Sequence, residues 1–130
     1  MKTLRLNSNT FPMTSEEISL YDKAGVETIC RELVDVQGES ALLAGIDAIA
    51  VVAAKVNAGM ISRMAKCRVI GRYGTGTDNI DKAAATAQGI VVTNVPDFCL
   101  SEMADHTLAL LLGLARKLLI MDRSTRTGEW

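Results

Sequence analysis

The run Gly71-Arg72-Tyr73-Gly74-Thr75-Gly76-Thr77-Asp78-Asn79-Ile80-Asp81 contains the residue types best suited to hold a ligand. Two glycines flank Thr75, and such a loop leaves backbone N–H groups free to converge on an anion. Arg72 beside them can hold a carboxylate through two hydrogen bonds. As a dinucleotide fingerprint the run is weak, because Asn79 stands where the third glycine of G-x-G-x-x-G belongs. Two interpretations of this loop by itself stay open: a site for a small acid, and a tight turn with a solvated arginine.

A second candidate ligand loop is Ala53-Ala54-Lys55-Val56-Asn57, which follows an apolar run. Ligands of open α/β sheets bind beyond the carboxyl ends of the strands, so this loop is expected at the same edge as residues 71–81. Its small residues would let a ligand approach the backbone. Lys55 is a possible charge partner, although a solvated lysine is the simpler interpretation. Asp78, Asn79 and Asp81 could form an acid/base cluster, but Asn79 and Asp81 fit the roles of turn residue and helix N-cap better.

Short apolar runs alternate with helical patterns over the first 93 residues. The predicted strands are 2–6, 26–30, 46–53, 67–70 and 90–93, and the predicted helices are 14–24, 37–44, 57–65 and 81–88. Thr14 and Glu17 have capping-box spacing at the start of the first helix. The almost continuous apolar run 46–53 is typical of a strand buried on both faces. The pattern predicts an α/β fold with five parallel strands in a doubly wound sheet.

The segment after residue 100 differs, because it predicts one long helix from Ser101, as N-cap, to Met121. Its centre is apolar nearly all round, whereas a surface helix is apolar along one stripe only. The helix therefore needs cover on two sides. That cover is either a larger core or, as we favour, a second domain or subunit outside this sequence.

Composition excludes several classes of protein. The 130 residues suggest one domain, and 14 Lys+Arg against 15 Asp+Glu give a net charge of −1 with 4% aromatic residues. A charge this close to zero gives no basic surface for binding nucleic acid or an anionic membrane. No apolar run has the ~20 residues that a helix needs to span a bilayer. Three cysteines and one histidine argue against a disulfide framework and a metal site, and favour reduced thiols in the cytoplasm.

Three blocks of sequence then point to one family. These are 69–81 (VIGRYGTGTDNID), 89–96 (GIVVTNVP) and 101–112 (SEMADHTLALLL). In order and spacing they resemble the D-isomer-specific 2-hydroxyacid dehydrogenases, which include phosphoglycerate dehydrogenase and the C-terminal-binding-protein corepressors. The resemblance is strong from residue 46 onward and looser over residues 2–30.

The resemblance implies a flavodoxin-like substrate-binding domain interrupted by an inserted Rossmann domain that binds NAD. Residues 1–100 would be the first portion of the substrate-binding domain. Residues 101–130 would be the connector helix and the approach to a NAD-binding domain that is absent from this chain. In this family the connector often lies at a dimer interface, so a cytoplasmic homodimer is expected.

Carried over position by position, the resemblance implies two sets of site residues. The substrate-binding set is Ala53, Ala54, Arg72, Gly74 and Gly76, and the cofactor-binding set is Thr75 and Met103. No catalytic residue is expected in this chain, because the family's Arg, Glu and His lie downstream. His106 matches the connector helix, four residues after Glu102, and is interpreted as a paired interdomain histidine.

The expected function is the substrate-binding portion of an oxidoreductase. The whole enzyme would transfer a hydride between NAD and C2 of a 2-oxo or D-2-hydroxy acid, and this chain alone would be inactive. Phosphoglycerate-type members carry Arg-Ser where Val51-Val52 stands, which favours a small unphosphorylated acid. The alternatives are a NAD-sensing corepressor-type interaction module and, less well supported, a stand-alone flavodoxin-like domain.

Overall fold

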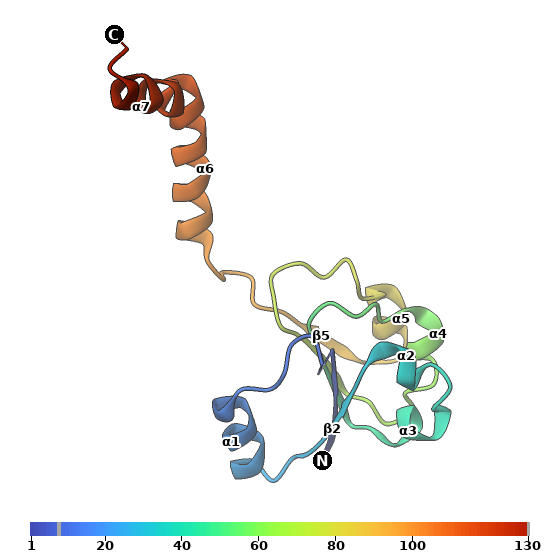
Figure 1. Cartoon of the computed structure of the whole chain (residues 1–130). Helices are drawn as coiled ribbons and strands as arrows, with labels where there is room; N and C mark the ends of the chain where they lie inside the picture. Colours follow the sequence, from blue (N-terminus) through green and yellow to red (C-terminus); the bar gives the residue numbers. More distant parts are fainter. Residues whose placement is uncertain (8, 130) are drawn as a thin grey trace. The chain divides into compact units, whose positions relative to one another are not determined.

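A computed structural model describes residues 1–7 and 9–129, which form two compact units (Figure 1). The first unit is Met1–Pro96 and the second begins at Asp97. The strands of the first unit are β1 (Lys2–Leu6), β2 (Glu27–Arg31), β3 (Ala48–Val51), β4 (Val69–Arg72) and β5 (Val91–Thr93). Its helices are α1 (Ser15–Lys23), α2 (Leu33–Val36), α3 (Ser40–Gly45), α4 (Ala58–Ile61) and α5 (Lys82–Ala87).

The five strands form one parallel sheet in the order β2-β1-β3-β4-β5. This is the flavodoxin-like order, so the predicted fold class is confirmed. β3 lies between β1 and β4, with Ile49 paired to Leu4 on one side and to Ile70 on the other. Because all strands run the same way, the loops after β1, β3 and β4 emerge side by side at one edge.

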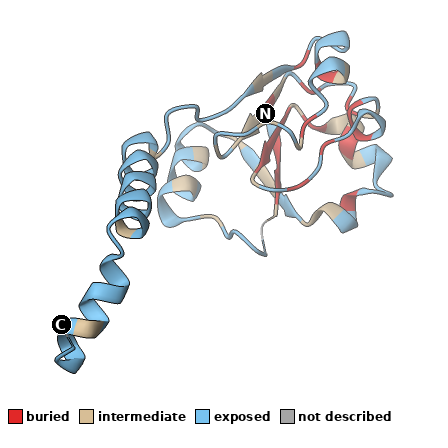
Figure 2. Cartoon of the chain, turned by 90° about the horizontal axis from the view of Figure 1, so that it is seen from above, coloured by how far each residue is buried: buried red, intermediate tan, exposed pale blue. Residues whose placement is uncertain are grey.

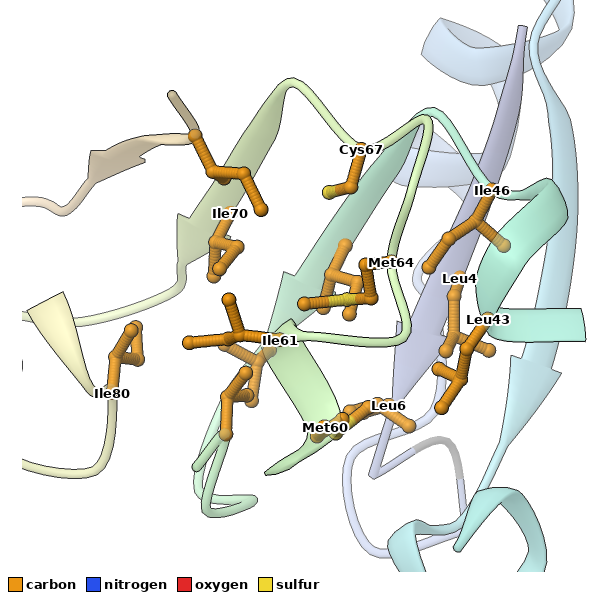
Figure 3. Close-up of a cluster of buried hydrophobic side chains, with 14 of the residues drawn as sticks. Leu4, Leu6, Leu43, Ile46, Met60, Ile61, Met64, Cys67, Ile70 and Ile80 are labelled. Atoms are coloured by element: carbon orange, nitrogen blue, oxygen red, sulfur yellow. The ribbon is translucent and has the colours of Figure 1, made fainter. Parts of the chain in front are cut away.

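The main core lies between the sheet and the helices α2 to α5 (Figure 3). Leu4 and Leu6 of β1 meet Leu43 of α3 and Met60 of α4 there, each at most 4% exposed. All four residues of β3 are buried, as the apolar run predicts for a strand covered on both faces. In Figure 2 the buried residues concentrate on the central strands and the inner sides of these helices.

On the opposite face of the sheet lies α1, which begins as its sequence predicts and differs in one contact (Figure 1). The Thr14 side chain accepts a hydrogen bond from the Glu17 backbone N–H (3.1 Å), which is one half of a capping box. The predicted return bond from the Glu17 carboxylate is absent among the described contacts. That carboxylate instead accepts from Arg5 and Tyr73, because a buried guanidinium is a stronger partner than an exposed backbone N–H.

Several predicted boundaries shift in the structure. The helix predicted over 37–44 corresponds to α3, which begins three residues later, at Ser40. The sequence did not predict the short helix α2 before it, which begins at a capping box between Glu32 and Asp35. The helix predicted over 57–65 ends at Ile61, although Asn57 does cap it. The strand predicted over 67–70 begins two residues later, and that predicted over 26–30 begins one residue later.

The second unit contains two helices, α6 (Leu100–Ala115) and α7 (Leu118–Thr127). The prediction of one continuous helix from Ser101 to Met121 is therefore wrong. Lys117 has a φ of 54° in the left-handed region, which breaks the helix between the two segments. Ser101 lies inside the first turn, and Cys99 occupies the N-cap with no side-chain hydrogen bond.

The apolar side chains of α6 and α7 are exposed over the described residues (Figure 2). Leu114 and Leu119 are 77% and 83% exposed. This is the uncovered surface that the all-round apolar pattern predicts. Over the described part of the chain, no helix combines the length and the apolar character needed to span a bilayer.

Candidate functional site

The two candidate ligand loops meet at the carboxyl edge of the sheet. A hollow of about 270 Å³ there is lined by Ala53, Arg72, Gly76, Asp78 and Asn79. Three of the predicted substrate residues therefore line one hollow: Ala53 after β3, Arg72 at the end of β4 and Gly76 in the loop that follows β4. Its size suits a ligand of a few heavy atoms, and its only cationic lining residue is Arg72.

Arg72 ends β4 and its guanidinium folds over the following glycine. One N–H, on Nη1, donates to the Tyr73 carbonyl at 2.9 Å. A Cβ placed on Gly74 would lie 1.3 Å from that same nitrogen, so only glycine leaves room for this orientation. Arg72 forms no ion pair among residues 1–7 and 9–129, and its Nε is buried without a partner there. The guanidinium thus keeps donors for an acid.

The loop Gly74–Gly76 is held by its carbonyl groups. Asn94 donates from Nδ2 to the Thr75 carbonyl (2.7 Å), and the Val95 N–H donates to the Gly74 carbonyl (3.1 Å). The backbone N–H groups of Thr75 and Gly76 donate to no other described residue. Carbonyls tied inward and N–H groups left open are the arrangement that receives an anion.

The loop after β3 is tied differently from the sequence-based expectation. The backbone N–H groups of Ala53 and Ala54, which the small side chains were expected to leave open to a ligand, both donate to the Asn7 side chain. Ala54 is buried and does not line the hollow, whereas Ala53 does. Ala53 therefore offers a methyl group to the hollow rather than a donor.

The other polar residues of the two loops take structural positions. Asp81 accepts from the Ala84 N–H through Oδ1 and caps α5, as predicted. Asn79 donates to the Ala54 carbonyl at 2.8 Å, which makes it a loop residue rather than an acid/base group. Lys55 is exposed and lines a hollow that shares Asp78 and Asn79 with that of Arg72, but it does not line the Arg72 hollow itself. Of the three side chains of the suspected carboxylate cluster, Asp78 alone retains a carboxylate facing the candidate site.

A polar network around the buried Arg5, which sequence reasoning missed, anchors the start of the glycine loop. Arg5 of β1 is 2% exposed and its Nε pairs with Oε1 of Glu17 at 3.0 Å. Tyr73, the residue before Gly74, donates to the same Oε1 (2.9 Å), and its ring lies 4.9 Å from the Arg5 guanidinium. The only sequence signal was an arginine alternating with leucines in β1.

The electrostatics of this network keep Tyr73 neutral. Burial, followed by hydrogen bonds with Tyr21 (2.8 Å) and Glu17, raises the pKa of Tyr73 far above its ordinary value. Since Tyr73 donates to Glu17, Tyr21 is the donor to Tyr73. The phenol is consequently an anchor and not a proton-transfer group near neutral pH.

Met103 and His106 lie on α6 in the second unit, where Met103 is 60% exposed. The described contacts of His106 include no hydrogen bond or ion pair with Glu102, its predicted helical neighbour. The roles assigned to both residues rest on the family resemblance and stay predictions.

Residues 8–127 match the family described as D-isomer specific 2-hydroxyacid dehydrogenase, catalytic domain. A D-3-phosphoglycerate dehydrogenase of Archaeoglobus fulgidus is 46% identical over 76 residues, which are 58% of this chain and 14% of that protein. A glyoxylate reductase of Pyrococcus furiosus is 46% identical over 65 residues, which are 50% of this chain and 19% of that protein.

Among solved structures, a NAD+-bound 3-phosphoglycerate dehydrogenase of Entamoeba histolytica is similar with a TM-score of 0.62 and 26% identity. The similarity covers 72% of this chain and 32% of that one. Because the family match extends over most of the chain, the protein belongs to the D-isomer specific 2-hydroxyacid dehydrogenase family. The chain spans well under half the length of these relatives.

Proposed function

We propose that this chain is the substrate-binding portion of a NAD-dependent D-2-hydroxyacid dehydrogenase. The observation that carries the proposal is the hollow at the carboxyl edge of the sheet, where Arg72 faces Ala53 and Gly76 within a member of this family. Arg72 and the open N–H groups of Thr75 and Gly76 would hold the acid's carboxylate. Held there, the acid is oriented with its 2-carbon toward the cofactor.

The cofactor we propose is NAD, which the relative from Entamoeba histolytica binds. When bound, the reduced nicotinamide of NADH would donate a hydride to C2 of the 2-oxo acid, and the oxidised nicotinamide of NAD+ would accept one from C2 of the 2-hydroxy acid. The exposed Thr75 would contact the nicotinamide side, and Gly74 and Gly76 leave room for that approach because they carry no side chain. Met103 would form a further contact. Residues 1–100 would carry the substrate, and residues 101–130 would connect to a NAD-binding domain.

The substrate we propose is a small unphosphorylated 2-oxo acid such as glyoxylate. Reduction adds a hydride from NADH to C2 and a proton to its oxygen. Val51 is fully buried and Val52 half-buried, so neither position offers a charge for a phosphate. We expect the 130-residue chain alone to bind the acid without reducing it.

The partner we propose for α6 is a second copy of this chain, in a homodimer. The exposed leucines of α6 and α7 support a covered surface in the assembled protein. We further propose that the protein resides in the cytoplasm, where Cys30, Cys67 and Cys99, all unpaired, would stay reduced. Light scattering over a concentration series of wild type and Leu111→Lys tests the dimer: a dimer that dissociates in the variant supports it, and a monodisperse wild-type monomer refutes it.

The binding experiment is a titration followed by ¹H–¹⁵N spectra. Oxalate, a stable two-carbon diacid, is added to wild type, Arg72→Gln and Arg68→Gln. Arg68 is an exposed arginine just before β4, at the opposite edge of the sheet, and serves as the matched control. The shifts of the Thr75, Gly76 and Ala53 amides give the affinity for oxalate. An affinity that falls about tenfold or more in Arg72→Gln, and not in Arg68→Gln, supports the function, since a charge-assisted pair to a carboxylate is lost. Equal binding by all three proteins, or none by wild type, contradicts it.

A further inference from the structure

Asn7 lies at the point where β1 ends, beside the loop that follows β3. Its Oδ1 accepts two backbone hydrogen bonds, from Ala53 N–H at 3.0 Å and from Ala54 N–H at 2.8 Å. Its φ is 62°, a left-handed conformation that asparagine adopts more readily than most residues. One side-chain oxygen therefore occupies a pair of convergent donors that an anion would otherwise compete for.

Asn79 holds the same loop from the other side. It follows β4, and its Nδ2 donates to the Ala54 carbonyl at 2.8 Å. The backbone at Asn79 also accepts from the Val56 N–H at 2.8 Å, next to a parallel bridge between Val56 and Ile80. Because β3 lies between β1 and β4, the loop after β3 is fastened to both neighbouring strand ends.

We propose that Asn7 is a positioning residue that, together with Asn79, sets the wall of the hollow opposite Arg72. The inference rests on the proposed function and deepens it. With both alanine N–H groups occupied, the acid's carboxylate is left to Arg72 and the glycine loop. The Ala53 methyl then borders the other end of the acid, where it leaves room for a small group and supplies no hydrogen-bond donor.

Three variants separate the oxygen of Asn7 from its backbone conformation. Asn7→Gly keeps the left-handed backbone without strain and removes the acceptor oxygen. Asn7→Asp keeps both the conformation and an acceptor. Asn9→Gly is the matched control, because Asn9 is exposed in the same loop and its side chain has no described hydrogen bond.

The experiment measures amide exchange and oxalate binding by ¹H–¹⁵N spectra on the whole chain. In Asn7→Gly we expect the Ala53 and Ala54 amides to exchange about tenfold or more faster, since each loses its partner. Exchange should stay slow in Asn7→Asp and Asn9→Gly. Oxalate should bind several-fold more weakly to Asn7→Gly than to Asn9→Gly, although Arg72 is intact in both. A general loss of structure would instead accelerate exchange throughout β3 and β4, and rescue by Asn7→Asp distinguishes the two effects.

The outcomes that overturn the inference differ from those that overturn the function. If wild type and Asn7→Gly bind oxalate equally well, Asn7 does not position the site, and the proposed function stands. Unchanged exchange at Ala53 and Ala54 in Asn7→Gly overturns the inference in the same way. If wild type shows no oxalate shift at millimolar concentration, the proposed function fails and takes the inference with it.

Discussion

Replacing Glu17 by alanine should destabilise the protein strongly, because it leaves the Arg5 guanidinium charged and buried without a counter-ion. The Arg5 side chain is 3% exposed and that of Glu17 is 17% exposed, so water screens this pair little. Removing one partner of a buried pair costs about 3–5 kcal/mol, and the partial exposure of Glu17 places the cost near the lower end. That loss is a large share of the roughly 5–15 kcal/mol that stabilises a typical domain.

The control for this prediction is Glu27→Ala. Glu27 pairs with Lys2 at 3.4 Å, but the two side chains are 59% and 53% exposed. An exposed pair of this kind contributes about 0–1 kcal/mol and weakens further in salt. Glu17→Gln provides a second comparison, since its amide oxygen still accepts from Arg5 and Tyr73 while the charge is gone, and it should fall between the two alanine variants.

Thermal unfolding followed by circular dichroism measures the stability of all three variants. For a unit of about a hundred residues, a loss of about 3 kcal/mol lowers the midpoint of thermal unfolding by roughly 12 °C or more. The double variant Arg5→Met/Glu17→Met should be more stable than Glu17→Ala, because it removes the uncompensated charge along with its partner. If Glu17→Ala loses no more stability than Glu27→Ala, the account of the buried pair is wrong.

Three further predictions concern other parts of the fold. Gly74→Ala should weaken oxalate binding about tenfold or more and lower stability by about 1–3 kcal/mol, because its Cβ would displace the Arg72 guanidinium. Gly38→Ala is the control and should change binding little, since the space around its Cβ is open. Equal oxalate affinities of the two variants would refute this packing. Leu43→Ala should lower the free energy of unfolding, measured in urea, by about 2–5 kcal/mol because Leu43 is fully buried. Leu119→Ala, at a position 83% exposed, should lower it by less than about 0.5 kcal/mol. Similar losses in the two variants would contradict the described core. Burial raises the pKa of the Cys67 thiol, so the folded state favours the protonated form. The free energy of unfolding should therefore fall as pH rises above about 8.5, and this fall should be absent in Cys67→Ala. A wild type whose free energy of unfolding falls no more steeply with pH than that of the variant would rule this out.

The sheet could be predicted well from the sequence, because parallel strands buried on both faces produce continuous apolar runs. The run 46–53 contains β3, and short loops with helical patterns between the runs are enough to predict a doubly wound sheet. The boundaries of the helices were harder to predict from the sequence than the sheet. The pattern over 101–121 gives no local sign of the break at Lys117, since a left-handed lysine is rare and has no motif of its own.

Part of the candidate site could likewise be predicted from the sequence, and part could not. Residue types alone were enough to single out Arg72, Gly74 and Gly76, because glycines and an arginine after a buried strand are unusual and chemically informative. The sequence also carried the spacing by which the family can be recognised. These are local properties, and local spacing is preserved whatever the rest of the chain does.

Only the tertiary structure decided which distant residues support that loop. Asn7 reaches Ala53 and Ala54 across 46 and 47 positions of sequence, and Tyr73 reaches Glu17 across 56. No periodicity links such pairs, because their proximity arises from the order β2-β1-β3-β4-β5, which places the ends of β1, β3 and β4 side by side. The sequence by itself determined the chemistry available at the edge of the sheet, and the packing of the strands decided which groups are held in place and which stay open to a ligand.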